Sequence, residues 1–139
     1  MQPNKMKAKI LAGKPVFGVS VMIPSVQIVE IIGHLGFDWI LIDCEHGNIT
    51  LETAELLTLA AEAVGLTPIA RPRSNNPEEI LQLMDRGVMG VQVPHVNTVE
   101  DARRAVEAVK YHPIGTRGLG GAHERPNTAW VYQWTIIWP

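Results

Sequence analysis

A cluster of side chains able to exchange protons follows the most apolar run of the sequence. Residues 39–42 are four large hydrophobic residues, and Asp43, Glu45 and His46 come directly after them. A carboxylate beside an imidazole can hold one tautomer of the ring and tune it for proton transfer near neutral pH. His46 is therefore a candidate general base, with Asp43 and Glu45 to orient it or to assist a metal ion. The alternative is that His46 is a solvated loop residue.

Arg71 is a second candidate, because it ends the next apolar stretch of the chain. A guanidinium group at this place could bind a carboxylate or an enolate oxygen, or it could form an ordinary surface salt bridge. His95 follows a later apolar stretch and is kept as a residue lining the same site. Asp85, on pattern alone, is an ordinary polar residue near a helix end. Cys44 stands between two acids that disfavour its thiolate, which argues against a nucleophilic role.

Repeats of a helix, a glycine and a strand would bring these residues to one edge of a sheet. Gly36, Gly65 and Gly87 each end a predicted helix, and the predicted strands are residues 16–22, 39–42, 67–70 and 88–93. Such βα units give parallel strands with helices outside, and loops at the carboxyl ends of the strands carry the site. Four units fit either an open doubly wound sheet or half of an eight-stranded barrel. Periodicity does not choose between them.

Caps and apolar stripes are predicted for the helices as well, beginning with a short helix over residues 4–12. Pro24 suits the first turn of the next helix, whose expected stripe has four apolar residues: Ile28, Ile31, Ile32 and Leu35. Thr50 and Asn76 are expected to cap the two helices that follow. Residues 97–100 resemble a capping box for the last helix. Its expected buried face comprises Val99, Ala102, Val106 and Val109.

Composition limits the class of protein. The chain has 139 residues, 46% of them hydrophobic, which is sufficient for a core, and the formal charge of −2 gives no case for nucleic acid binding. No run approaches the roughly 18 apolar residues of a membrane span, and the N-terminus lacks the apolar stretch of a signal peptide. We therefore expect a cytoplasmic protein that binds neither nucleic acid nor membrane.

The pattern of βα units changes after residue 111. Residues 112–121 form a glycine-rich loop, but they lack the spacing of a dinucleotide fingerprint and the lysine of a P-loop. Residues 130–139 contain three of the four tryptophans. Such a tail would expose a large aromatic surface unless something covers it.

Five segments, taken together and in order, resemble the HpcH/HpaI aldolase family. They are residues 36–46, 70–72, 82–87, 91–94 and 111–118, which read GFDWILIDCEH, ARP, QLMDRG, VQVP and YHPIGTRG. The resemblance covers about residues 8–125. It implies a (β/α)8 barrel of the phosphoenolpyruvate/pyruvate type, of which this chain holds about the first four βα units. Members commonly form hexamers, which implies a homo-oligomer.

The resemblance also implies roles for individual residues. His46 matches the catalytic base, Asp85 the acid that pairs with it, and Arg71 the residue that contacts the pyruvyl group and stabilises the enolate. Pro94 is expected to line the substrate site, with Asp43 and Glu45 in support. Members are metal-dependent aldolases that cleave 4-hydroxy-2-oxo acids to pyruvate and an aldehyde. The implied substrate is a small 2-oxo acid, and the implied cofactor is Mg²⁺, Mn²⁺ or Co²⁺.

The chain departs from the family after Gly121. Family members hold the metal through a glutamate and an aspartate in later strands, and nothing here resembles those stretches, so no metal ligand is assigned and the chain by itself is expected to hold none. We expect residues 1–125 to be the N-terminal half of an aldolase barrel and residues 126–139 an atypical tail, from a truncated or frameshifted reading frame. Two classes stay open: a lyase, or a non-catalytic half barrel that acts through self-association or a complementary half.

Overall fold

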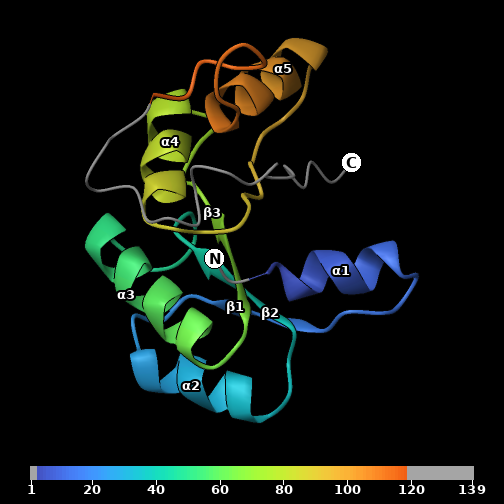
Figure 1. Ribbon diagram of the computed structural model, residues 1–139. Helices are drawn as coiled ribbons and strands as arrows, with labels where there is room; N and C mark the ends of the chain where they lie inside the picture. The colour runs from blue at the N-terminus through green and yellow to red at the C-terminus, as the bar shows by residue number, and fades with distance from the viewer. Residues whose placement is uncertain (1–2, 119–139) are drawn as a thin grey trace.

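Three parallel strands form the centre of the computed structural model, which describes residues 3–118. The strands are β1 (Gly18–Val21), β2 (Trp39–Asp43) and β3 (Thr67–Arg71), in the spatial order β1-β2-β3. Helices α2 (Val26–His34), α3 (Leu51–Ala63) and α4 (Pro77–Asp85) lie on one side of this sheet, and α1 (Lys5–Leu11) lies on the other (Figure 1). The parallel βα units predicted from the sequence are confirmed.

The fourth predicted strand is reduced to a single bridge. Val91 pairs in parallel with Ala70 of β3, and the amide of Gln92 donates to the Ala70 carbonyl over 2.9 Å. The position beside β3 is therefore as expected, but residues 88–93 do not form a full strand. Gly90 and Pro94 bracket the bridge, and neither residue type favours a regular strand interior. Helix α5 (Val99–Val109) follows and packs against α4.

The predicted stripe of α2 is partly wrong. Val29 and Ile32 are buried, whereas Ile31 is 57% and Leu35 70% exposed. A Cβ atom added at Gly33 would lie 2.3 Å from Val64 Cγ2, so α2 crosses the end of α3 at a point where only glycine fits. This close approach turns the face holding Val29 and Ile32 inward. Ile31, about 160° around the axis from Val29, then points outward.

The residues at the helix N-termini agree with the sequence prediction, with two corrections. Thr50 and Asn76 cap α3 and α4 as predicted, but α2 is capped by Ser25, so Pro24 precedes that helix. The α5 capping box joins Thr98 to Asp101, and Val99 is 76% exposed instead of buried. The buried face of α5 comprises Ala105, Ala108 and Val109. Val99 lies about 120° around the helix from Ala105, and so outside that face.

The sheet is apolar on both faces, as predicted for the strand that holds Trp39. Ile40 and Ile42 belong to the large core beneath α2, α3 and α4, whereas Leu41 joins Met6 and Ile69 in a second cluster on the opposite face. On that opposite face an open groove of about 580 Å³ is lined by Met6, Ile10, Val16, Trp39, Leu41, Ile69 and Gln92. A sheet with helices on one face and apolar side chains on the other has the arrangement expected for part of a barrel wall.

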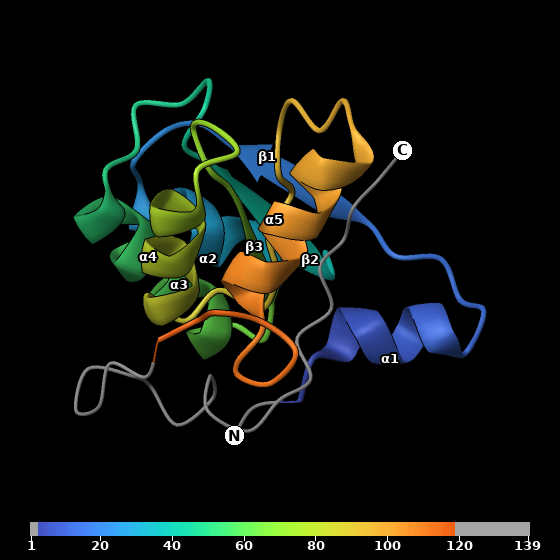
Figure 2. The ribbon, with the colours of Figure 1, turned by 90° about the horizontal axis from the view of Figure 1, so that it is seen from above.

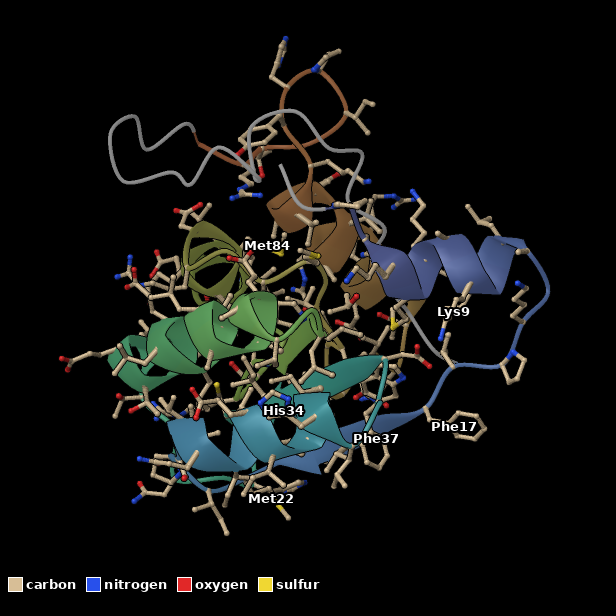
Figure 3. All side chains as sticks on the ribbon, turned by 60° about the horizontal axis from the view of Figure 1, so that its bottom comes forward. Lys9, Phe17, Met22, His34, Phe37 and Met84 are labelled. Carbon is tan, nitrogen blue, oxygen red and sulfur yellow. The ribbon has the colours of Figure 1, made fainter. Side chains whose placement is uncertain are left out.

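Helix α1 stands out from the body when the molecule is seen from above (Figure 2). A contact between the Lys9 ammonium and the Asp38 carboxylate ties it to the start of β2, and the amide of Met6 donates to the Thr67 hydroxyl over 3.3 Å. The Phe17 side chain, in the segment between α1 and β1, projects into solvent and is 65% exposed (Figure 3). Among residues 3–118, none of the helices has the length and apolar composition needed to cross a membrane.

Candidate active site

Asp43 is the most deeply buried side chain of the candidate site. It is the last residue of β2 and is fully buried. Its Oδ1 atom accepts hydrogen bonds from the backbone amides of Glu45 and His46, each over 3.1 Å. A Cβ atom added at Gly47 would lie 2.3 Å from the Asp43 carbonyl oxygen, so only glycine fits in the turn. This turn sets the direction in which Glu45 and His46 leave the strand.

Arg71 meets Asp43 from the end of the neighbouring strand. The two residues are register partners of β2 and β3, so their side chains leave the sheet at the same level. The guanidinium donates from Nε to Oδ1 over 3.0 Å and from Nη2 to Oδ2 over 2.5 Å. Burial by itself raises the pKa of Asp43, but the Arg71 hydrogen bonds and the two backbone amides outweigh it and hold this pKa below its usual range. The Asp43 hydrogen bond likewise raises the pKa of Arg71.

The Glu45 carboxylate joins three further groups at this edge. Its Oε2 atom lies 3.2 Å from Arg71 Nε and 3.6 Å from His46 Nε2, and its Oε1 atom lies 3.1 Å from His95 Nε2. All three are ion-pair contacts by distance, and the contact with His95 is the shortest of them. The His46 and His95 side chains are 63% and 71% exposed, which leaves both imidazoles accessible to a ligand.

His95 is predicted from the sequence only as a lining residue, and the structure places it in direct contact with Glu45. Its sequence signal is position: like His46, it comes directly after a segment that pairs in the sheet. Pro94, half-buried, precedes it at the same edge. The structure therefore brings Asp43, Glu45, His46, Arg71 and the 94–95 segment together, as expected for the carboxyl edge of a parallel sheet.

Asp85 does not join this cluster within the chain. It ends α4, shortly before Met89, whose amide donates to the carbonyl of Pro68 near the start of β3. Asp85 and His46 therefore lie at opposite edges of the sheet. Asp85 instead accepts a 2.8 Å hydrogen bond from Nη2 of Arg117, a residue to which the sequence pattern assigns no role. The Arg117 side chain is fully buried and also packs on the Tyr111 ring.

No set of metal ligands is assembled in the part of the chain that the structure describes. Residues 3–118 contain no group of three histidine, cysteine, aspartate or glutamate side chains arranged to hold an ion. Asp43, the most deeply buried carboxylate, is occupied by Arg71 and two amides. Burial raises the pKa of the neighbouring Cys44 thiol to about 11, so it is protonated at neutral pH. The described residues therefore do not fit a divalent ion.

Parallel βα units with polar and charged side chains at their carboxyl edge are typical of the α/β class, both of (β/α)8 barrels and of open sheets. The sequence agrees with this class: the model of the family "HpcH/HpaI aldolase/citrate lyase" matches residues 18–134. The chain belongs to the HpcH/HpaI aldolase/citrate lyase family. The match extends past the domain boundary predicted at residue 125, into residues outside those that the structure describes, so that boundary stays a prediction.

Individual relatives agree with this assignment. The chain is 38% identical to 4-hydroxy-2-oxo-heptane-1,7-dioate aldolase from Escherichia coli over 122 residues, which are 88% of this chain and 47% of that one. It is 40% identical to 2-dehydro-3,6-dideoxy-6-sulfogluconate aldolase from Pseudomonas putida, over 76% of this chain and 42% of that one. The chain thus spans about half the length of the curated relatives it matches.

Two solved structures share the fold. An HpcH/HpaI aldolase from Desulfitobacterium hafniense DCB-2 superposes with a TM-score of 0.81 at 30% identity, over 91% of this chain and 49% of that one. The citrate synthase SbnG superposes with a TM-score of 0.78 at 35% identity, over 82% of this chain and 46% of that one. These matches choose the barrel over the open sheet, a choice that periodicity alone does not make.

Proposed function

We propose that this chain is part of an aldolase that cleaves 4-hydroxy-2-oxo acids to pyruvate and an aldehyde. The observation that carries the proposal is the arrangement of His46, Glu45 and Arg71 around buried Asp43, at the sheet edge where barrel enzymes hold their substrates. Membership in the aldolase family supports the reaction class. The relatives named as aldolases act on small 2-oxo acids, which supports a substrate of that kind.

His46 is the proposed base. In the cleavage direction it takes the proton of the C4 hydroxyl group, the oxygen electrons form the aldehyde carbonyl, and the C3–C4 bonding pair passes to the pyruvate enolate. The enolate then takes up a proton at C3 to give pyruvate. The His46 imidazole is 63% exposed and lies 3.6 Å from the Glu45 carboxylate, so it can reach a ligand at this edge of the sheet.

Arg71 is the proposed partner of the developing enolate. The two hydrogen bonds to Asp43 and the contact with Glu45 use only its Nε and Nη2 atoms. A guanidinium has five N–H donors in a fixed fork, so Nη1 is left for a carboxylate or enolate oxygen of the substrate. Asp43 holds this fork rigidly, which is the preorganisation that charge stabilisation requires. Pro94 is proposed to line the substrate site beside it.

A divalent ion is proposed as the cofactor only because the chain belongs to this family. Residues 3–118 do not supply its ligands, so no step is assigned to it. We also propose, from composition and charge, a cytoplasmic location without nucleic acid or membrane partners. Self-association into a homo-oligomer is proposed from the family resemblance. The proposed pairing of Asp85 with His46 is not made within the chain, where Asp85 bonds Arg117.

A second candidate function is a non-catalytic half barrel that acts by binding another copy or a complementary half. The observation that favours it is the 580 Å³ groove on the sheet face away from α2, α3 and α4. Apolar surface of this kind is normally covered by protein. Size-exclusion chromatography with light scattering tests this candidate, because a stable monomer would contradict it.

The aldolase proposal is tested with residues 1–118 joined to the remaining half of the E. coli relative. Pyruvate release from 4-hydroxy-2-oxo-heptane-1,7-dioate is measured with Mg²⁺, Mn²⁺ or Co²⁺ present. We expect metal-stimulated, chelator-sensitive release from the completed barrel, and none from the 139-residue chain. A folded, completed barrel that releases no pyruvate from any 4-hydroxy-2-oxo acid would contradict the proposed reaction.

A further inference from the structure

The two oxygen atoms of Glu45 have different partners. Oε2 faces the two residues of the proposed chemistry, at 3.2 Å from Arg71 Nε and 3.6 Å from His46 Nε2. Among residues 3–118, Oε1 faces only His95, at 3.1 Å. The shorter of the two carboxylate–imidazole contacts is therefore made by the histidine to which the proposed mechanism assigns no role.

His95 reaches Glu45 across the end of β3. Glu45 belongs to the turn after β2, whereas His95 follows the segment that pairs on the far side of β3, so Arg71 lies between their strand positions. His95 adopts a φ of +55°, and it is the one residue other than glycine with a positive φ in the part of the chain that is described. Its carbonyl oxygen accepts a 3.4 Å hydrogen bond from Asn97. The loop is thus shaped to turn this imidazole toward Glu45.

The contact restrains a group that would otherwise be free to rotate. The terminal torsion of a glutamate side chain is broad, so a carboxylate held at one oxygen alone can swing about that contact. With His95 on Oε1, the plane of the carboxylate is defined from both sides. The Glu45 side chain is only 13% exposed, so water competes less for this carboxylate than at an ordinary surface pair.

We propose that His95 is a positioning residue for the lyase reaction. It binds Oε1 of Glu45 and thereby holds Oε2 against Arg71 and His46, so that the base and the enolate partner keep their places. His95 takes no part in proton transfer with the substrate. The catalytic meaning of this role rests on the proposed function, whereas the positioning itself is a property of the folded chain.

The test uses NMR of the 139-residue chain with labelled histidine and arginine side chains. Glu45→Gln and His95→Leu should shift the His46 imidazole and Arg71 Nε–H resonances in the same direction. His95→Gln should return them toward the wild-type positions, because its side-chain amide can donate to Glu45. Leucine and glutamine are equally poor at a positive φ, so the pair is matched for backbone strain and differs in whether the side chain can donate to Glu45. His34→Gln, at an exposed position on α2, should leave both signals unchanged.

Two results would overturn the inference. One is that the His46 and Arg71 signals stay in place in His95→Leu, and the other is that they move equally in His95→Leu and His95→Gln. Backbone amide spectra verify that the variants are folded. In the completed barrel, His95→Leu should lower kcat about tenfold with KM little changed, and His95→Gln should restore most of it. If the signals move as expected but no completed barrel releases pyruvate, the positioning contact stands and the proposed reaction fails.

Discussion

Asp43 and Arg71 face each other as register partners at the ends of two neighbouring parallel strands, joined by two hydrogen bonds of 3.0 and 2.5 Å. The pair is anchored on the sheet and not on loops, so its geometry depends on the core. The edge of the guanidinium that holds Nε and Nη2 is thereby fixed, and Nε on this edge also lies 3.2 Å from Oε2 of Glu45. The stability of the fold and the proposed chemistry therefore both depend on this pair.

Asp43→Asn should destabilise the chain by roughly 3 kcal/mol, because it removes the charged partner of Arg71 at a fully buried position. The pKa of Asp43 is lowered on folding, so its contribution is complete above the unfolded-state value of about 3.9 and is lost as the pH falls through the folded-state value. Urea unfolding from pH 7 to pH 2 measures this. The free energy of unfolding of the variant should change less with acid than that of the wild type, and parallel curves would contradict the assignment.

His46→Ala in the completed barrel should lower kcat for pyruvate release by roughly 100-fold, the effect of losing a general base. Its side chain is 63% exposed, so stability should change little. His34→Ala, an exposed histidine on α2 (Figure 3), is the matched control and should retain full activity. Equal rates for His46→Ala and the wild type would exclude His46 as the base.

Arg71→Ala should lower kcat at least as much as His46→Ala, because it removes charge stabilisation at the enolate. It should also destabilise the chain, since buried Asp43 loses its partner. Arg71→Lys separates the two effects. A lysine keeps a positive charge near Asp43 but loses the fork of donors, so stability should recover more than kcat. Recovery of both to the same extent would mean that Arg71 acts only through stability.

Thr98→Ala should destabilise α5 by about 1 kcal/mol, because Thr98 accepts the Asp101 amide hydrogen bond at the helix start. The neighbouring Val99→Ala is the matched control. Val99 is 76% exposed, so its loss should change stability by less than about 0.5 kcal/mol. Thermal unfolding of the two variants compares them directly. A larger effect for Val99→Ala would support the buried position that helical periodicity predicts for it.

The amino-acid sequence by itself determined the elements and the edge at which the site lies. The apolar run before Asp43, the helix-ending glycines and the caps at Thr50 and Asn76 are local signals, and the structure contains each of them as expected. Parallel strands then bring residues that follow them to a common edge, whatever the details of packing. For this reason the order of apolar runs and polar residues along the chain is sufficient to assign His46 and Arg71 to one site.

Only the tertiary structure decided which side chains touch. The contact of Glu45 with His95 and the bond of Asp85 to Arg117 join residues far apart in the chain, and no local pattern encodes the rotation and height at which their elements meet. The same holds for Ile31, which helical periodicity places in the core and the close approach of Gly33 to Val64 turns outward. Periodicity defines a face of a helix, but contact with its neighbours decides which way that face is turned.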